Sequence, residues 1–343
     1  MKKILFLHSE LATYFLACVE ELSRRAEVHI IHWPINPEAP FQFSFSDQIQ
    51  FYAKEDFDEG TLVSKVADIN PDMIVCSGWR DPLYMKIIKR RTTGIQILSL
   101  DNPWSGNWKQ VVWSLLSRFR LKPFFNYVWV AGERQKTYAS KLGFEKEQIL
   151  PFLYSADLSS FQAIFHEKKS IEKEEKSILY IGRYSEEKNT DFLFDAFQKF
   201  RAKHPEWTLV CMGTGPLFNK RQDFEGIKHL GFVQPEEMKY HLLRASAFVL
   251  PSLFEPWALV AHEMAACGMV LLLSDAVGAK ERFLKEKENG FSFDPHSKSS
   301  LLGAFNQLAD LDDEQLREFS EKSFSLSNEI SPQKWASSLV DLL

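Results

Sequence analysis

The sequence predicts an α/β protein built from two doubly wound, parallel-sheet domains. The chain has 343 residues, and a single hydrophobic core rarely keeps growing beyond roughly 250–300 residues. Short apolar runs alternate with amphipathic stretches in both halves, as expected for parallel strands joined by helices. A polar, charge-dense segment at residues 166–177, HEKKSIEKEEKS, separates the two series and reads as a linker.

The first half opens with a strand, an amphipathic helix and a second strand, and the alternation then continues. We expect a Rossmann-like domain over residues 1–165. Its predicted strands are Lys3–His8, Glu27–Trp33, Met73–Cys76, Ile95–Leu100 and Tyr127–Ala131, with helices at Leu11–Arg25 and Arg134–Leu142.

The second half repeats this order and predicts a Rossmann-like domain over residues 178–325. Residues 326–343 are expected to form a C-terminal helix that can cross back to the first domain. The predicted strands are Ile178–Gly182, Trp207–Met212, Ile227–Leu230, Ala247–Leu250 and Val270–Ser274, with helices at Glu236–Arg244 and Pro256–Cys267. Ligands of such sheets bind at the carboxyl ends of the strands.

Composition narrows the class of protein. A hydrophobic share of 45% and a charged share of 25% are ordinary for a folded protein, and a net charge of -5 does not favour a nucleic-acid partner. The four cysteines are widely spaced, so we expect buried core residues rather than a metal site or disulfides. The apolar start is too short for a signal peptide, and no stretch approaches the roughly 20 apolar residues of a membrane span. We therefore expect a cytoplasmic protein.

The predicted helix Pro256–Cys267 carries the strongest signal for a binding site. Pro256 fits the first helical position, where its missing N–H has no cost, and Gly268 fits the position just past the helix end. The backbone amides of Trp257, Ala258 and Leu259 would then point from a positive helix terminus, which is a natural site for an anion.

Two glutamates flank this helix start. Glu255 directly precedes it, and Glu263 would lie roughly 10 Å further along the axis, about the span from a donor sugar to the ribose of its nucleotide. The alternative is an acidic residue favoured by the helix dipole and a second on the solvent face. The apolar strands Phe248–Leu250 and Val270–Leu273 indicate a buried helix, in which an unpaired glutamate is costly, and this favours the functional interpretation.

A second cluster of candidate residues follows the first strand of this half. Gly182 permits a sharp turn, and Arg183 and Lys188 flank the loop. Arginine can hold a diphosphate through two parallel contacts and lysine acts as a point charge. Two exposed surface cations are the alternative.

Weaker signals come from three other loops. Gly213 and Gly215 follow one strand, and either a close ligand or a simple turn explains them. The loop Gly231–Val233 could offer main-chain groups to a nucleobase, and Ser274–Ala279 could add amides near phosphates.

Together these segments resemble the family-4 retaining glycosyltransferases, which have the GT-B fold of two Rossmann-like domains facing a central cleft. The resembling positions are Gly182 to Lys188, Gly213–Pro216, Gly231–Val233, Pro251-Ser252 with Glu255 and Glu263, Gly290 and Asp294-Pro295. The match runs over about residues 177–295 and joins several motifs in the family's order, so it is specific.

The resemblance implies a role for each matched residue. Arg183 and Lys188 would hold the donor diphosphate, Glu255 the donor sugar and Glu263 the ribose. It implies a UDP- or GDP-sugar as co-substrate, with no metal and no separate cofactor. The complete set of expected donor-binding residues is Arg183, Lys188, Gly213, Gly215, Val233, Glu255, Trp257, Ala258, Leu259 and Glu263.

The first half departs from the family pattern at two places. His8-Ser9-Glu10 follows the first strand in place of a glycine pair, and Asp101-Asn102 stands where the family has a histidine beside the reacting sugar. Asp101 is therefore a candidate catalytic base, together with Glu255, Arg183 and Lys188 as catalytic groups. Helix capping by Asp101 or Asn102 is the alternative.

Residues 103–125 combine three tryptophans with four basic residues and no acidic one. Aromatic and basic residues on one helix suit an interface with anionic lipid, and a core helix with exposed cations is the alternative. Contact with the inner face of a membrane is expected here if the acceptor is lipid-linked rather than a soluble carbohydrate.

The sequence thus predicts transfer of a sugar from a nucleotide-diphosphate donor to an acceptor hydroxyl, with retention, in glycan, polysaccharide or lipopolysaccharide biosynthesis. A nucleotide-sugar epimerase of the same fold and a non-catalytic nucleotide-sugar-binding subunit are the alternatives. A dehydrogenase is disfavoured, because no Gly-x-Gly-x-x-Gly follows Ile4–His8 or Ile178–Gly182.

Overall fold

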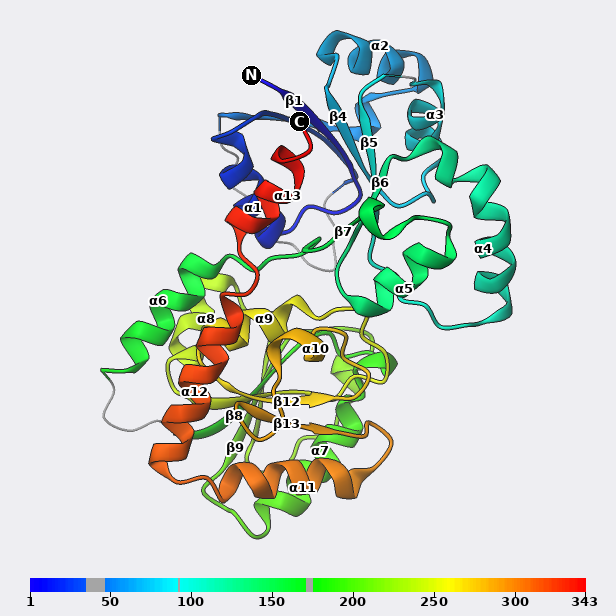
Figure 1. Cartoon of the computed structure of the whole chain (residues 1–343). Helices are drawn as coiled ribbons and strands as arrows, with labels where there is room; N and C mark the ends of the chain where they lie inside the picture. The colour runs from blue at the N-terminus through cyan, green and yellow to red at the C-terminus, as the bar shows by residue number, and fades with distance from the viewer. Residues whose placement is uncertain (35–46, 92, 171–174) are drawn as a thin grey trace. The chain divides into compact units, whose positions relative to one another are not determined.

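The computed structural model describes residues 1–34, 47–91, 93–170 and 175–343. The chain divides into two compact units (Figure 1). Unit 1 comprises Met1–Ser155 and Ile330–Leu343, and unit 2 comprises Ala156–Glu329.

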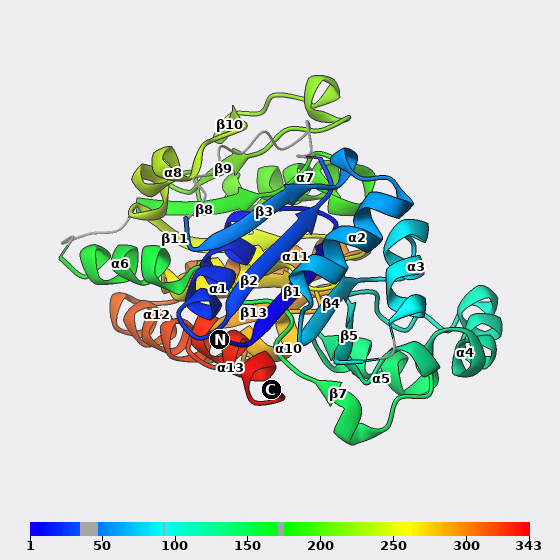
Figure 2. The same ribbon diagram turned by 90° about the horizontal axis from the view of Figure 1, so that it is seen from above.

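Unit 1 contains a seven-stranded parallel sheet with strand order β3-β2-β1-β4-β5-β6-β7. Figure 2 shows β2, β1 and β4 lying side by side. The order reverses between β1 and β4, the position at which doubly wound sheets bind ligands. The strands are β1 Lys3–His8, β2 Glu27–His32, β3 Ile49–Ala53, β4 Met73–Ser77, β5 Ile95–Leu100, β6 Tyr127–Val130 and β7 Ile149–Leu150. The helices are α1 Thr13–Ser23, α2 Glu59–Ile69, α3 Pro82–Arg90, α4 Trp108–Arg120, α5 Glu133–Lys141 and α13 Pro332–Val340.

Unit 2 contains a six-stranded parallel sheet with strand order β10-β9-β8-β11-β12-β13. Its strands are β8 Glu175–Ile181, β9 Thr208–Met212, β10 Ile227–Gly231, β11 Ala245–Leu250, β12 Val270–Ser274 and β13 Gly290–Phe293. Its helices are α6 Leu158–Lys168, α7 Thr190–Arg201, α8 Pro235–Leu242, α9 Leu259–Ala266, α10 Lys280–Phe283, α11 Lys298–Ala309 and α12 Asp313–Ser327.

Continuous apolar runs form the central strands because helices cover both faces of a parallel sheet. Every residue of β11 and β12 is buried. The four cysteines are buried and free, which confirms their expected place in the core. No helix among the described residues has both the length and the apolar character needed to cross a membrane.

The expected linker at residues 166–177 needs correction. Its first residues end helix α6 and its last residues begin strand β8, both within unit 2, whereas residues 171–174 lie outside the described part. One of the charged residues of this segment is not exposed to solvent. The side chain of Lys168 is buried, and its Nζ donates to the carbonyl of Ala245 at 2.6 Å. The boundary between the units therefore lies between Ser155 and Ala156.

The C-terminal segment from Ile330 groups with unit 1. Its helix α13 packs on α1. Trp335 is buried beside Trp129, and its indole N–H donates to the carbonyl of Leu153 at 2.9 Å. Trp335 thus helps to anchor the last helix, together with a hydrogen bond from Arg25 to Ser337 at 2.9 Å.

Candidate functional site

The loops that carry the expected donor-binding residues meet at the carboxyl end of the sheet of unit 2. Backbone hydrogen bonds tie these loops together in pairs. The Tyr184 amide donates to Thr214, the Leu253 amide to Glu187, and the Gly278 amide to Glu255, at 2.8–3.0 Å. The loops after β8, β9, β11 and β12 therefore form one connected rim.

Lys188 and Glu255 form an ion pair at the centre of this rim. Lys188 ends a 3-10 turn after β8 and Glu255 follows β11, and the Lys188 Nζ donates to the Glu255 Oε2. The two side chains are only 19% and 13% exposed. The buried Ser252 hydroxyl donates to the same carboxylate oxygen at 3.3 Å, and its carbonyl accepts from Ser274 at 2.6 Å. The predicted cation and carboxylate are thus held together by their own contact and by Ser252.

Arg183 lies on the same loop with its side chain exposed. A hydrogen bond holds the backbone of Arg183 in place, because the hydroxyl of the buried Tyr180 donates to the Arg183 carbonyl at 2.7 Å. Hydrogen bonding by Ser185 lowers the pKa of Glu187, and the charges of Arg183 and Lys188 lower it further. Besides the paired Lys188, the loop thus carries one exposed cation, Arg183, and two glutamates, Glu186 and Glu187.

The glycines after β9 are explained by contact between loops. A Cβ on Gly213, whose φ is +127°, would lie 2.0 Å from the Gly182 carbonyl oxygen. A Cβ on Gly215 would lie 2.7 Å from the Tyr184 carbonyl oxygen. Both glycines permit close packing of protein backbone. Val233 is half-buried in the loop after β10, where the Gly231 carbonyl accepts from the Gly213 amide at 2.7 Å.

The start of the key helix differs from the prediction. Helix α9 begins at Leu259 and not at Pro256, because Ala258 adopts a left-handed conformation with φ 79°. Trp257 therefore lies before the helix and is buried. In the part of the chain that the structure describes, no group accepts from the backbone amides of Ala258, Leu259 and Val260. The amide donors at a helix terminus are present, shifted by about one residue.

Glu263 is the fifth residue of α9 and is half-buried. Burial, with a further contribution from Asp157, raises its pKa from 4.5 to about 7. No described group donates a hydrogen bond to the Glu263 carboxyl, whereas Asp157 accepts from Ser159 and Ser160 at 2.7 Å each. Because only the stretch from Leu259 is helical, the 10 Å spacing from Glu255 no longer follows from helix rise.

Asp101 lies in unit 1, at the end of β5. It lines a cavity of about 620 Å³ at the carboxyl end of that sheet, together with Asn102, His8 and Glu10. The Tyr154 hydroxyl donates to Asp101 Oδ2 at 3.4 Å. Asn107 caps the following helix α4, so neither Asp101 nor Asn102 has the capping role given as the alternative.

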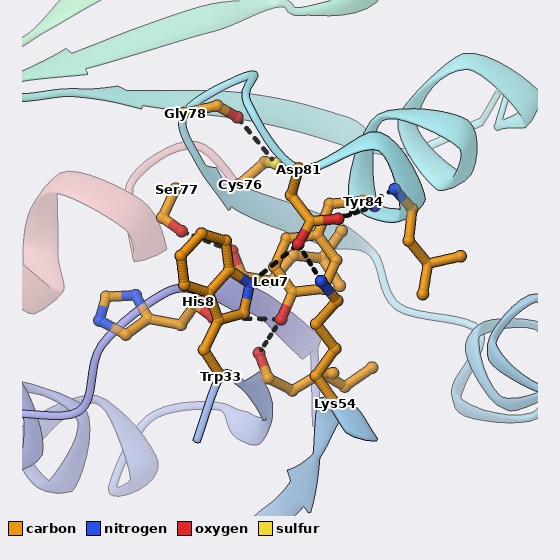
Figure 3. A network of polar contacts seen from close by, with 11 residues as sticks. Leu7, His8, Trp33, Lys54, Cys76, Ser77, Gly78, Asp81 and Tyr84 are labelled. Carbon is orange, nitrogen blue, oxygen red and sulfur yellow. Dashed lines mark hydrogen bonds and ion pairs between the residues drawn. The ribbon is translucent and has the colours of Figure 1, made fainter. Parts of the chain in front are cut away.

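Figure 3 shows a polar network that the sequence analysis missed, and two of its members, Trp33 and Asp81, line this cavity. Asp81 caps helix α3 by accepting from the Leu83 and Tyr84 amides, and it also accepts from the Trp33 indole and from Lys54. Burial alone would raise the pKa of Asp81, but these hydrogen bonds outweigh it and lower the pKa.

The same network reaches back to the first two strands. The Tyr84 hydroxyl contacts the carbonyls of His8 and Ile31 at 3.1 and 3.0 Å. The Asp81-Pro82 pair after a strand is a helix-start signal that could have located Asp81. Its partners Trp33 and Lys54 could not be found this way, since contacts between distant segments leave no local pattern.

The cavity of unit 1 has a lining suited to a sugar. Trp79 and Trp113 supply ring faces, and Arg80, Asn107 and Gln110 supply polar groups. Burial lowers the pKa of His8 to about 4, so its imidazole is neutral near pH 7. Within the described residues, no cluster of three or more His, Cys, Asp or Glu side chains is arranged to hold a metal ion.

Comparison with known proteins shows what the second half of the chain resembles. Residues 161–325 match the family described as glycosyl transferases group 1. An uncharacterised glycosyltransferase of Methanocaldococcus jannaschii is 29% identical over 179 residues, which cover 50% of this chain and 45% of that protein. The chain thus spans less than half the length of this relative.

Solved structures show a likeness over nearly the whole chain. A glycosyltransferase from Rickettsia africae superposes with a TM-score of 0.75 at 11% identity, over 99% of this chain and 97% of that one. Anabaena HepE in complex with UDP and glucose gives a TM-score of 0.70 at 14% identity, over 100% and 99%. At such identities the likeness shows the fold, which is two Rossmann-like parallel-sheet units of the GT-B type. Residues 161–325 are therefore similar to group 1 glycosyltransferases, and the chain has a fold of the GT-B type.

Proposed function

We propose that this protein transfers a sugar from a nucleotide-diphosphate donor to an acceptor hydroxyl, and that unit 2 binds the donor. The observation that carries the proposal is the rim of unit 2. Lys188 and Arg183 lie on one loop, the unpaired amides of Ala258 to Val260 lie at a helix terminus, and both loops meet through the Lys188–Glu255 pair. Such a combination of cations and oriented amides suits a diphosphate.

Each residue has a role in this proposal. The diphosphate draws Lys188 away from Glu255, and the released carboxylate then accepts hydrogen bonds from sugar hydroxyls. Glu263, which lacks a donor among the described residues, accepts from the ribose hydroxyls. Trp257, Gly213, Gly215 and Val233 shape the surrounding backbone.

Catalysis would rest on stabilising the charge that develops on the leaving diphosphate. Preorganised donors in a partly desolvated site act on that charge without reorganising during the reaction. We place the reaction in the retaining, metal-independent family-4 class, with a UDP- or GDP-sugar as donor, because the motifs of residues 177–295 follow that pattern. HepE, a structural neighbour, is described in complex with UDP and glucose. Asp101 in the cavity of unit 1 remains the candidate base on the acceptor side, where a carbohydrate or lipid-linked acceptor of glycan biosynthesis would bind.

The test is a thermal-shift screen with UDP, GDP and their sugars, followed by product analysis. A ligand that binds only the folded protein raises the unfolding temperature by mass action. We expect stabilisation by one nucleoside diphosphate, and transfer of its sugar to a hydroxyl acceptor. A new sugar isomer formed from donor alone would favour an epimerase, and binding without turnover would favour a non-catalytic subunit. No stabilisation by any of these compounds would refute the proposal.

A further inference from the structure

Helix α4, Trp108–Arg120, exposes its apolar side chains instead of burying them. It lies on the outer side of unit 1 in both views (Figures 1 and 2). The face turned inward consists of Gln110, Trp113, Ser114 and Ser117, and Ser117 is fully buried with its hydroxyl bonded to the Leu142 carbonyl at 3.2 Å. The exposed residues are Trp108, Val111, Val112, Leu115, Leu116 and Phe119.

This arrangement inverts the ordinary rule for a surface helix. The exposed residues recur at spacings of three and four, which places them on one stripe of the helix. Such a stripe normally faces the core, yet here Leu115 is 65% exposed and Phe119 is 81% exposed. Among the described residues twelve large apolar side chains are exposed, and six of them lie on this 13-residue helix. A contiguous exposed stripe of this kind indicates a surface that something else covers.

Basic residues border the stripe on both sides. At 3.6 residues per turn, Lys109 and Arg120 lie on one flank and Arg118 on the other. Lys122 follows the helix, and residues 102–132 contain no aspartate or glutamate. An apolar stripe between two rows of cations fits the boundary between acyl chains and anionic headgroups.

A shallow hollow at the end of α4 strengthens this charge argument. Arg118 and Lys122 line it with Ser140, Gly143 and Phe144, and its volume is about 370 Å³. Two cations, a hydroxyl and no acidic group make the hollow suitable for a phosphate headgroup.

We propose that α4 lies in the surface of an anionic lipid bilayer, with its apolar stripe among the acyl chains and its flanking cations at the headgroups. A second copy of the chain fits the surface less well. Two paired α4 helices would bring basic flanks together with no acidic partner from the same segment. The helix is also only about 20 Å long, and its footprint falls well below the roughly 800 Å² per partner of a stable interface.

The placement has a consequence for the cavity of unit 1. Asn107, Lys109, Gln110 and Trp113 of the same helix and its cap line that cavity. Docking through α4 therefore brings the cavity close to the bilayer surface.

The experiment is flotation of the full chain with vesicles of phosphatidylcholine alone or mixed with phosphatidylglycerol. Wild-type protein should bind the mixed vesicles at least about tenfold better than the neutral ones, and high salt should weaken this binding. Leu115→Ser with Phe119→Ser should reduce binding about tenfold or more, and so should Arg120→Glu with Lys122→Glu. The matched controls, Tyr240→Ser and Lys203→Glu, change an exposed aromatic and an exposed cation of unit 2 and should bind like wild type.

Two results would overturn the proposal. One is equal vesicle binding by the α4 variants and the controls. The other is a wild-type dimer in sedimentation that dissociates in the Leu115→Ser, Phe119→Ser variant without any vesicle binding. Circular dichroism of each variant shows whether it folds. Stabilisation by a nucleoside diphosphate is measured separately, so a failure of the proposed donor site would leave the vesicle result interpretable.

Discussion

At the scale of single residues, the Lys188–Glu255 pair combines two properties that usually exclude each other. It pairs two partly buried charges, and it keeps a cation on the same rim as the unpaired amides of Ala258 to Val260. Breaking one side of a buried pair is costly, because the remaining charge is left without a partner. Ligand binding avoids this cost only if phosphate replaces Glu255 and sugar hydroxyls replace Lys188.

This exchange leads to a first prediction. Lys188→Met should weaken nucleoside-diphosphate binding about 10- to 100-fold, since a hydrogen bond to a charged group contributes about 1.5–3 kcal/mol. It should also lower stability by about 1–3 kcal/mol, and adding Glu255→Gln should restore stability without restoring affinity. Calorimetric titration and chemical denaturation measure the two effects, with Lys203→Met as the surface control. Recovery of affinity in the double variant would contradict the assigned role of Lys188.

Glu263 supports a second prediction. Burial raises its pKa to about 7. Between pH 4.5 and about pH 7, Glu263 is protonated in the folded protein and ionised in the unfolded chain. The contribution of Glu263 to the stability of the folded protein therefore falls as the pH rises through this range. Glu263→Gln should thus stabilise the empty protein at pH 8 by about 1–3 kcal/mol. The same change should weaken binding of the nucleotide sugar, because an ionised carboxylate is the stronger acceptor for ribose hydroxyls.

Chemical denaturation of the wild type and of Glu263→Gln at pH 5 and pH 8 tests the expected difference in unfolding free energy. The gain should be largest at pH 8 and close to zero at pH 5. Donor affinity should also fall as pH drops below about 7 in the wild type and show no such step in the variant. An unchanged or lower stability of Glu263→Gln at pH 8 would contradict the raised pKa of Glu263.

At the scale of elements, the sequence predicts the buried strands well and the turns before helices poorly. The strand Val270–Ser274 is a continuous apolar run that follows the helix-ending Gly268 and precedes Asp275, and its limits agree with the structure. The start of α9 was misplaced because nothing local signals that Ala258 adopts a left-handed conformation. The linker was predicted at residues 166–177 because the sequence does not distinguish a buried lysine such as Lys168 from an exposed one.

The residues of the candidate sites likewise fall into those that a local motif predicts and those that only the fold brings together. Arg183, Lys188, Glu255 and Glu263 could be predicted because each belongs to a local motif. The Asp81 network could not, since its members Trp33, Lys54 and Asp81 meet only after β2, β3 and β4 pair.

The contact between the loops after β8 and β9 gives a third prediction. In Gly213→Ala the new Cβ would meet the Gly182 carbonyl oxygen at 2.0 Å in a backbone conformation that L-residues avoid. We expect a loss of about 2–4 kcal/mol in unfolding free energy and weaker donor binding, since the Arg183 loop must move. Gly303→Ala in α11 is the control, because its Cβ would meet nothing within 4 Å, and it should stabilise by about 0.5–1 kcal/mol. Equal stability of the two variants would show that the loops are not tightly packed.

At the scale of the whole molecule, the two units should respond differently to acid. Burial lowers the pKa of His8 in unit 1 and of His262 in unit 2 to about 4. Each unfolded histidine binds a proton near pH 6.5, so the stability that each contributes is complete above that pH and is lost as pH falls towards 4. The loss has an upper limit of about 3 kcal/mol per histidine. In unit 2, burial lowers the pKa of His229 as well, but Glu263 acts in the opposite sense over nearly the same range as His262 and offsets part of the loss.

We therefore predict that unit 1 loses more stability than unit 2 between pH 7 and pH 5. Tryptophan fluorescence reports mainly on unit 1, which contains seven of the nine tryptophans, whereas far-ultraviolet circular dichroism follows both units. The fluorescence midpoint in urea should fall further than the circular dichroism midpoint on acidification, and His8→Gln should reduce that fall. In unit 2, Glu263→Gln should increase acid sensitivity, because it removes the offsetting carboxyl and leaves His262 unopposed. Parallel shifts of both midpoints, unchanged in either variant, would mean that these buried groups do not control the acid response.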